Sequence, residues 1–331
     1  MVAQPCGAAS PHSKPLQIYF VDVEGGQATL IVSPSGESLL IDAGWPDNEG
    51  RDADRIVAAA HQARIKQIDY VLITHYHRDH VGGVPQLVER MKIGTFVDHG
   101  PNQEDSDVTR QDYAAYLKAV GHSPRVSLRP GEGLPIKGLT VQVLTAAGEH
   151  ISGPLPGAGE ANPNCVSEPP PVADVTENPR SLGMLISFGK FTFLDLGDLT
   201  KQKEMELMCP NNLVGTVDLF LVSHHGSDQS DSKALVWALH PRVAIMNNGA
   251  HKGGSPQAWQ TVHDSPGLVD LWQLHYAVAG GEQHNVAEKF IANPQPDEKD
   301  DAGNYIKVVA EPDGTFTVIN SRNDFQKTYA K

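Results

Sequence analysis

The stretch that decides the fold of this chain is His75-Tyr76-His77-Arg78-Asp79-His80, which directly follows the apolar run IDYVLIT at residues 68–74. Six residues therefore hold three imidazoles and a carboxylate. Imidazole nitrogens and carboxylate oxygens are the usual ligands of catalytic Zn²⁺, and they also suit Mn²⁺ and iron. A short, nearly continuous apolar run is typical of a buried strand. The pattern therefore predicts a metal site at the end of a strand, where the sheet holds the backbone.

The spacing within this stretch predicts two neighbouring ions. His75 and His77 stand two apart in an extended segment, so both can converge on one ion. Asp79 and His80 follow after the turn and can reach a second ion. A chance cluster of surface histidines is disfavoured, because the ligand types, their spacing and the strand–loop–helix setting agree.

Two later segments repeat this design, in which an apolar strand delivers a ligand at its carboxyl end. Residues 191–196 (FTFLDL) lead to Asp198, and residues 219–223 (LFLVS) lead to His224 and His225. Asp198 can bridge two cations, while His224 or His225 completes the shell of the second ion. An Asp after a strand is more often a turn or cap residue when it stands alone.

The whole constellation resembles the metallo-β-lactamase superfamily. The His-x-His-x-Asp-His core is preceded by Asp42 in LIDAG and followed by Asp198 and His224, and the resemblance covers roughly residues 18–248. It implies a four-layered α/β/β/α sandwich of two mixed sheets flanked by helices. Its metals would lie at the edge between the two sheets.

Within this superfamily the chain is most similar to the hydrolase domain of competence-type DNA-uptake proteins. The similarity lies in the opening at residues 20–23 (FVDV), the Ser181-bearing strand and the His-His-Gly-Ser block at residues 224–227. The usual Gly-Gln-Gly-Asp opening is altered to EGGQ at residues 24–27. This departure means that nuclease activity is not simply inherited.

A further histidine usually completes the first metal shell in this superfamily. His150 stands between the core motif and Asp198, but its surroundings differ from the usual ones. Competence-type proteins can lack this histidine, so Glu177 or Asn178 could line the gap instead. His150 and these two residues remain alternatives.

Weaker candidates follow other strands. His99 could face the site or make a structural hydrogen bond, and Asn178 is a candidate substrate residue. Lys252 could bind an anionic group, although its Gly-rich surroundings could equally form a plain turn. His275 has apolar neighbours that favour a buried structural role. Neither a Gly-x-Ser-x-Gly elbow nor a phosphate-cradling P-loop is present in the sequence.

Length and charge limit the classes of partner. The chain has 331 residues and a formal charge of −14, from 26 basic and 40 acidic side chains, with no Lys/Arg cluster. Proteins that grip long nucleic acids usually present a basic stripe. The balance therefore favours a small-molecule substrate over a polymeric polyanion. Membrane insertion is not expected, because no apolar run approaches the ~20 residues that a bilayer requires.

The three cysteines are Cys6, Cys165 and Cys209, and none belongs to a Cys-x-x-Cys pair. Cys165 and Cys209 lie in loop-like segments and could form a disulfide, which would imply export; two unrelated thiols are the alternative. Residues 1–14 read as a flexible lead-in, as at the start of a mature exported protein. An exported location is therefore favoured over a cytoplasmic one.

Periodicity predicts one mixed domain over residues 15–331, with a long loop at about 148–179 over the active face. The strands are expected at 16–23, 28–32, 38–42, 68–74, 95–98, 139–144, 183–188, 191–196, 219–223, 243–247, 305–310 and 315–320. The helices are expected at 52–63, 84–91, 110–120, 201–208 and 232–239.

These observations predict a dinuclear hydrolase that uses a metal-bound hydroxide, with zinc favoured over manganese or iron. Asp79, Asp42 and His225 are its candidate catalytic residues. The resemblance favours a phosphodiester or other phosphoester, whereas the acidic surface favours a lactone or β-lactam. A binding module with purely structural metals is the third reading, and the open coordination argues against it, because structural zinc sites are closed by four protein ligands.

Overall fold

The alternation of apolar side chains along the strands explains the layered architecture. The computed structural model describes residues 14–46, 48–166, 173–295 and 302–331. In β1 (Leu16–Phe20), Ile18 and Phe20 belong to the core between the two sheets, whereas Tyr19 packs beneath the helices on the other face. Successive side chains of a strand point to opposite faces. Because both faces of each sheet are apolar, one face packs against the other sheet and the opposite face packs against helices.

The two sheets are mixed, and over the described part of the chain each has nine strands. The first has the order β18-β17-β16-β1-β2-β3-β4-β5-β6, and the second has the order β15-β14-β13-β12-β11-β10-β8-β7, with β9 paired to β8. The strands of the first sheet, after β1, are β2 (Thr29–Val32), β3 (Ser38–Ile41), β4 (Gln67–Leu72), β5 (Lys92–Asp98), β6 (Arg125–Ser127), β16 (Ile306–Ala310), β17 (Phe316–Asn320) and β18 (Gln326–Tyr329). Those of the second sheet are β7 (Gly133–Leu134), β8 (Thr140–Ala146), β9 (Glu149–His150), β10 (Gly183–Phe188), β11 (Phe191–Asp195), β12 (Leu219–Leu221), β13 (Val243–Met246), β14 (Asp270–His275) and β15 (Ile291–Asn293).

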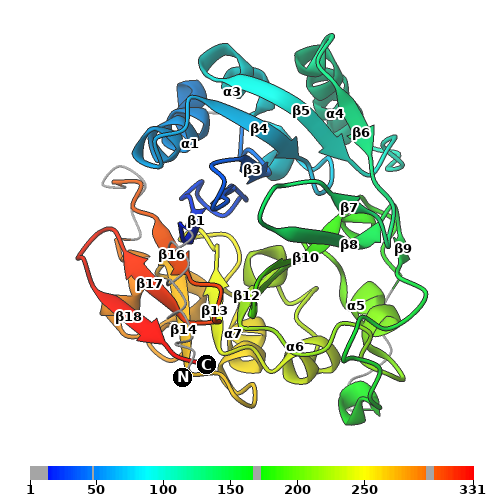
Figure 1. Cartoon of the computed structure of the whole chain (residues 1–331), viewed down its shortest axis with the longest axis vertical. Helices are drawn as coiled ribbons and strands as arrows, with labels where there is room; N and C mark the ends of the chain where they lie inside the picture. The colour runs from blue at the N-terminus through cyan, green and yellow to red at the C-terminus, as the bar shows by residue number, and fades with distance from the viewer. Residues whose placement is uncertain (1–13, 47, 167–172, 296–301) are drawn as a thin grey trace, which may run out of the picture.

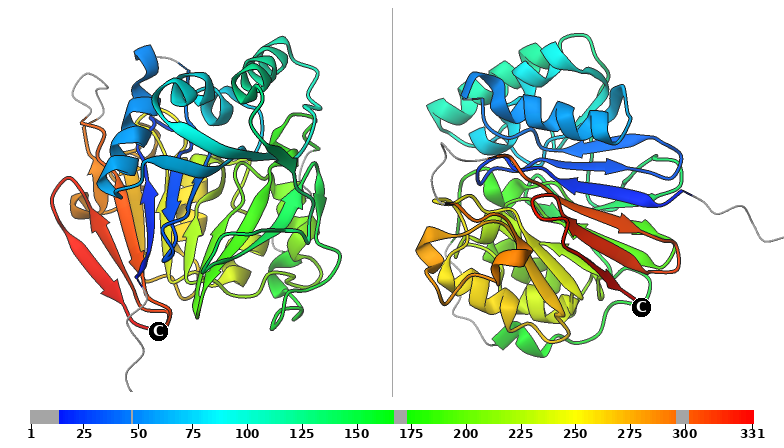
Figure 2. Two further views of the ribbon diagram at one scale, coloured as in Figure 1. Left: turned by 45° about the horizontal axis from the view of Figure 1, so that its top comes forward. Right: turned by 90° about the vertical axis from the view of Figure 1, so that its left-hand side faces the viewer.

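Helices cover the two outer faces, as Figures 1 and 2 show. The first sheet carries α1 (Arg51–Gln62), α3 (Val84–Arg90) and α4 (Asp107–Val120), and the second carries α5 (Lys201–Met208), α6 (Lys233–Leu239) and α7 (Pro256–His263). The short α2 (Arg78–Val81) follows β4. The expected four-layered α/β/β/α sandwich is confirmed. Among the described residues, no helix is long and apolar enough to cross a membrane.

The predicted strands and helices are present, with ends within three residues of those expected. The predicted helices do not include α7. Its start is nevertheless typical of a helix, because Ser255 supplies a capping hydroxyl and Pro256 lies in the first turn. The predicted strands also lack β14, because the apolar neighbours of His275 were interpreted as evidence for a buried histidine and not for a strand. The predicted lead-in at residues 1–14 lies, apart from Lys14, outside the described residues.

Parallel strands bring the predicted ligands to a common edge. Strands β3, β4 and β5 are parallel neighbours in one sheet, and β11 and β12 are parallel in the other. The two edges are joined directly, since the N–H of Leu182 donates to the carbonyl of Thr74 at 2.8 Å. Gly197 has a φ of 57°, and a Cβ there would lie 2.9 Å from Cβ of Thr74. Glycine at this position therefore allows the sheets to meet where Asp198 begins its loop.

The long loop at 148–179 is tied to the second helical layer. Its described part contains β9 and two short 3₁₀ turns, Pro163–Val166 and Asn178–Arg180. A disulfide joins Cys165 to Cys209 at the end of α5. The side-chain amide of Asn162 donates to the carbonyls of Met208 and Ala234. These contacts anchor the loop to α5 and α6.

The disulfide is expected to contribute substantially to stability. It joins cysteines 44 residues apart, and closing a loop of this length in the unfolded chain stabilises the fold by about 4 kcal/mol. The Cys165→Ser/Cys209→Ser protein should therefore lose about this much unfolding free energy, measured by urea denaturation under non-reducing conditions. Cys6→Ser, which leaves the disulfide intact, is the matched control. Equal unfolding free energies for the double variant and the control would contradict the prediction.

The buried carboxyl group of Glu204, a residue of α5, predicts that the free energy of unfolding depends on pH. The side chain of Glu204 accepts the N–H groups of Asp231 and Ser232 at 2.8 and 2.7 Å. Burial raises its pKa to about 7, and burial together with the nearby Glu204 raises the pKa of Asp231 well above its usual value. A carboxyl whose folded pKa is raised binds more protons in the folded chain. Its stabilising effect is complete below the unfolded pKa and is lost as the pH rises through the folded pKa.

We expect Glu204 to lower the unfolding free energy by about 3 kcal/mol between pH 4.5 and pH 7. The Glu204→Gln protein should lack this decrease, because its amide does not ionise. Urea denaturation at several pH values measures the difference between the two proteins. The exposed Glu282→Gln serves as control and should follow the wild type. Parallel pH profiles for wild type and Glu204→Gln would exclude this role.

Candidate metal centre

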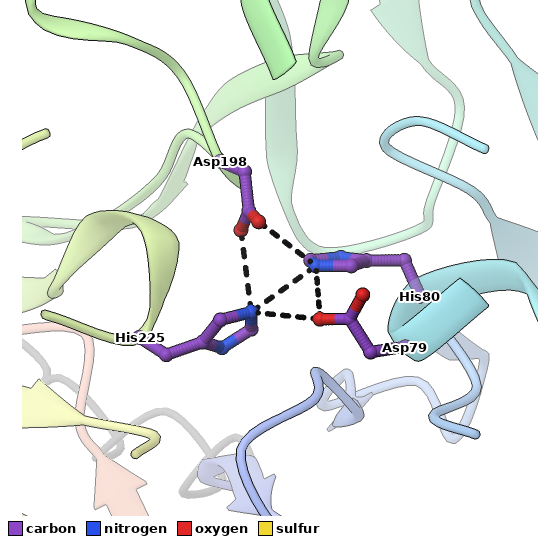
Figure 3. Close-up of side chains that lie close together, drawn as sticks. All are labelled: Asp79, His80, Asp198 and His225. Atoms are coloured by element: carbon purple, nitrogen blue, oxygen red, sulfur yellow. Dashed lines mark hydrogen bonds and ion pairs between the residues drawn. The ribbon is translucent and has the colours of Figure 1, made fainter. Parts of the chain in front are cut away.

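Four buried side chains from three segments converge at the edge between the sheets. Asp79 and His80 lie on α2, Asp198 follows β11, and His225 lies in the 3₁₀ turn Ser223–Gly226 after β12 (Figure 3). Nε2 of His225 lies 3.1 Å from Oδ2 of Asp79 and 3.2 Å from Nε2 of His80. Nε2 of His80 lies 3.2 Å from Oδ2 of Asp198. One ligand atom from each of the four residues lies within 4.8 Å of the others, so together they could hold a metal ion.

Asp42 determines which nitrogen of His80 faces this cluster. Its Oδ2 accepts a hydrogen bond from Nδ1 of His80 at 2.7 Å, and its Oδ1 accepts the N–H of Thr74 at 2.8 Å. A ring that donates from Nδ1 keeps a lone pair on Nε2. That lone pair points at the carboxylates of Asp79 and Asp198. This is the arrangement that a metal ligand requires.

His75 and His77 form a second convergence beside the first. The hydroxyl of Thr74 donates to Asp42 at 2.7 Å, so it accepts from Nδ1 of His75 at 3.0 Å. Nε2 of His77 donates to the Glu104 carboxylate at 2.9 Å. The lone pairs left on Nε2 of His75 and Nδ1 of His77 then lie 3.1 Å apart. Two lone pairs at this distance repel each other unless a cation or a proton lies between them.

The charges of the cluster also favour a cation. Burial raises the pKa of Asp79, but Lys252 and His80 lower it more, so the net pKa lies well below the usual value. Burial likewise raises the pKa of Asp198, and the surrounding histidines bring it well below the usual value. Burial lowers the pKa of His80, yet the carboxylates of Asp198, Asp79 and Asp42 raise it well above normal. Positive charge is therefore strongly stabilised here, and the nitrogen and oxygen donors fit a divalent metal ion.

The net pKa shifts of His75 and His224 are downward, opposite to that of His80. The pKa of buried His75 lies well below its usual value, because burial and the neighbouring rings of His80 and His77 disfavour the charged form. Burial lowers the pKa of His224 as well. Both rings are therefore neutral near pH 7, as metal ligands must be.

The ammonium group of Lys252 contacts the four-residue cluster through the carboxylate of Asp79. Its Nζ forms an ion pair with Oδ2 of Asp79 and lies 4.9 Å from the ring centroid of Trp45. Its loop packs against the N-terminal turn, where a Cβ on Gly25 would lie 2.9 Å from Cβ of Lys252. The ammonium therefore stands next to the ligands at a place where it could meet an anionic group.

The other candidate histidines do not belong to the four-residue cluster, and each has a hydrogen-bond partner of its own. His150 is half-buried in β9 and donates from Nδ1 to the carbonyl of Ile151 at 2.8 Å. His99 is buried, and its Nε2 donates to Glu177 at 2.8 Å. Nε2 of buried His275 donates to Asp22 at 2.7 Å.

Asn178 is buried at the start of the 3₁₀ turn Asn178–Arg180. It lines a cavity of about 520 Å³ together with Thr200 and Lys201. Since Thr200 stands two residues after Asp198, this cavity lies close along the chain to the candidate ligands. Asn178 is therefore placed where it could contact a bound molecule.

Two residues of the centre escaped the sequence analysis. Thr74 directly precedes the motif, and its position next to two predicted ligands was an available signal. Glu104 stands 27 residues after His77 in a loop that follows β5. Its Oε2 also accepts the N–H of Glu177 at 2.9 Å, so it joins His77 to the end of the long loop. Nothing in the local sequence marks Glu104 as a partner of His77.

Comparison with known proteins identifies relatives of the chain. The family model described as "Metallo-beta-lactamase superfamily" matches residues 21–163. Recombination protein 2 of Haemophilus influenzae is 26% identical over 238 residues, which are 72% of this chain and 25% of that protein. ComE operon protein 3 of Bacillus subtilis is 26% identical over 193 residues, 56% of this chain and 20% of that protein. The chain thus spans a quarter or less of these two relatives, and the competence-type resemblance is confirmed.

A UPF0173 protein of Pyrococcus abyssi is 28% identical over 242 residues, covering 71% of this chain and 86% of that protein. Among solved structures, the metallo-beta-lactamase fold protein YhfI of Bacillus subtilis is similar, with a TM-score of 0.47 and 14% identity. That similarity covers 78% of this chain and 96% of YhfI.

The contact between Glu104 and His77 predicts an effect on metal affinity. Glu104→Ala removes the acceptor that orients the ring, and the loss of such a partner typically weakens metal binding about 10- to 100-fold. Competition between the protein and a chromogenic chelator for Zn²⁺ measures the change. Asp105→Ala, in the same loop and fully exposed, is the control. An unchanged affinity in a folded Glu104→Ala protein would show that His77 is oriented without Glu104.

Proposed function

We propose that this chain, which matches the metallo-beta-lactamase superfamily model over residues 21–163, hydrolyses a small phosphodiester at a centre of two divalent ions. The observation that carries this proposal is the convergence of lone pairs and carboxylates at the sheet edge. Asp79, His80, Asp198 and His225 would hold one ion, and His75 and His77 would contribute to the other. Imidazole and carboxylate ligands suit zinc, with manganese or iron as alternatives.

The chain's own residues would prepare the centre in two ways, by orienting its histidines and by placing a carboxylate between them. When bound, two divalent ions lower the pKa of a shared water and neutralise charge on the group under attack. Asp42 and Thr74 hold the rings of His75 and His80 in the tautomer that presents Nε2. Asp198 lies between the two groups of ligands, with Oδ2 3.2 Å from Nε2 of His80 and 3.8 Å from Nε2 of His75.

Lys252 supports a phosphoester as substrate. A phosphodiester carries a negative charge that an ammonium group can compensate, and Lys252 stands beside Asp79. The competence-type relatives support the same substrate class. The charge of −14 and the lack of a Lys/Arg cluster favour a small diester over long nucleic acid. We therefore place the substrate among small phosphodiesters.

A lactone or β-lactam is the second candidate. The cavity that Asn178 and Thr200 line also contains Asp174, Asp228 and Lys201, so the described part of its wall carries more negative than positive groups and favours a neutral group. The third reading, a binding module with structural metals, is less well supported. The side chains of His77 and His224 are 25% and 14% exposed, so the ligands open towards solvent, whereas structural zinc sites are closed.

The location proposed for the protein follows from the disulfide. Bonds such as that between Cys165 and Cys209 persist in oxidising compartments and are rare in the cytosol. An exported location is therefore favoured. Its substrate would then be a small molecule met outside the cytoplasm.

The test is hydrolysis of bis(p-nitrophenyl) phosphate by the zinc-loaded protein. His80→Ala removes a ligand that the four-residue cluster needs, so we expect kcat/KM to fall about 100-fold or more. His150→Ala, outside this cluster, should retain activity. Lys252→Met should raise KM for this anionic diester and leave KM for a neutral lactone unchanged.

Each result of this test has a definite meaning. Cleavage of lactones without cleavage of the phosphodiester would replace the first candidate by the second. A protein that takes up no Zn²⁺, Mn²⁺ or Fe²⁺ would refute the hydrolase proposal itself. Metal uptake without turnover of either substrate would favour the binding module.

A further inference from the structure

The pair His75 and His77 provides two nitrogen ligands, and none of the hydrogen bonds or ion pairs described for His150 reaches either ring. Nδ1 of His150 is engaged with the carbonyl of Ile151. His224 does contact the Asp198 carboxylate: its Nε2 lies 3.4 Å from Oδ2, an oxygen that also lies 3.2 Å from Nε2 of His80. The same Oδ2 lies 3.8 Å from Nε2 of His75. His224 therefore shares a carboxylate oxygen with the first pair of ligands.

The backbone of the His224-His225 pair is unusual. Both residues have left-handed conformations, with φ and ψ of 50° and 40° for His224 and 56° and 18° for His225. Non-glycine residues rarely adopt this region, and such strain persists only where the surroundings enforce it. The N–H of His224 donates to the carbonyl of Gly197 at 3.0 Å, and the carbonyl of His225 accepts from Gly254 at 2.9 Å. The turn is thus held at both residues by other segments.

This conformation sends the two rings to different sides of Asp198. Their centroids lie 6.1 Å apart, with 74° between the ring planes. Nε2 of His225 lies 3.5 Å from Oδ1 of Asp198 and 3.1 Å from Asp79. Nε2 of His224 faces the other oxygen, Oδ2. Each oxygen of Asp198 therefore has one of the two adjacent histidines beside it.

The tautomer of His224 follows from Ser230. The Ser230 hydroxyl donates to the carbonyl of Leu199 at 2.7 Å, so it can only accept from Nδ1 of His224, which lies 3.4 Å away. Nε2 of His224 then carries a lone pair directed at the Asp198 carboxylate. Two acceptors cannot form a hydrogen bond with each other, and a cation between them removes the repulsion.

We propose that the adjacent histidines divide between the two ions, so that His224 completes the shell of the ion held by His75 and His77. His225 completes the other shell with Asp79 and His80, and Asp198 bridges the two ions. This assignment rests on the dinuclear centre of the proposed function. In this assignment His224, which follows β12, takes the place of the histidine that usually completes the first metal shell in this superfamily.

The assignment gives the two ions different surroundings. The first shell has three imidazoles and one carboxylate, and the second has two imidazoles and two carboxylates. Imidazole-rich shells favour zinc, whereas carboxylate-rich shells accept manganese more readily. Zinc should therefore bind first at the site that contains His224.

Metal counting in paired variants tests the assignment. Each protein is stripped with a chelator, dialysed against Zn²⁺ and analysed by elemental mass spectrometry. We expect two ions in the wild type and in His150→Ala, and one ion in His224→Ala and in His225→Ala. Adding His75→Ala to His224→Ala should leave one ion, because both residues serve the same site. Adding His75→Ala to His225→Ala should leave none.

A second variant guards against a folding defect at the strained position. His224→Gly suits the left-handed backbone better than alanine, and it should bind one ion with an unchanged circular dichroism spectrum. Two ions retained in His224→Gly would overturn the assignment, as would loss of an ion in His150→Ala. Loss of both ions in the His75→Ala/His224→Ala protein would overturn it too. A wild type without bound metal would refute the proposed function itself, which separates the two failures.

Discussion

The contacts of the Asp42 carboxylate are the interaction on which the centre depends. Asp42 directly follows β3 with a φ of 61°, and it accepts hydrogen bonds from the backbone and hydroxyl of Thr74 and from the ring of His80. Through Thr74 it also determines the tautomer of His75. The buried carboxylate of Asp42 thereby causes the Nε2 lone pairs of His75 and His80 to point towards the candidate metal centre. Burial of so many polar groups is tolerable only because each is hydrogen-bonded or faces a charge.

The sandwich supplies the rigidity that this arrangement needs. The ligands come from the carboxyl ends of strands in two different sheets, and the hydrogen bond from Leu182 to Thr74 joins the sheets at that point. Apolar side chains on both faces of each sheet hold the strands from either side. The loops that carry ligands are therefore short extensions of a packed core. The long loop, which carries the disulfide, contributes Glu177 to the contact between Glu104 and His77.

The turn of His224 and His225 shows how a chain can supply a ligand that its sequence lacks at the expected position. Two adjacent side chains in an ordinary strand point to opposite faces of the sheet. Two successive left-handed residues direct both rings to the metal centre at different angles. The strain is maintained by two backbone hydrogen bonds, from the N–H of His224 to the carbonyl of Gly197 and from the N–H of Gly254 to the carbonyl of His225. Lys252 then stands beside Asp79 at a candidate centre whose ligands come from both sheets.

The sequence by itself determined the layered fold, the principal strands and helices, and the segments that carry the candidate metal ligands. These features are local, because a period of two residues, a period near four and a ligand motif after an apolar run each lie within about ten residues. Only the tertiary structure decided that Cys165 meets Cys209, that Glu104 holds His77, and that His225 joins Asp79 and His80 while His224 faces the other side of Asp198. Those contacts join distant segments, or depend on backbone angles that the packing of both sheets enforces, and neither is encoded in local spacing.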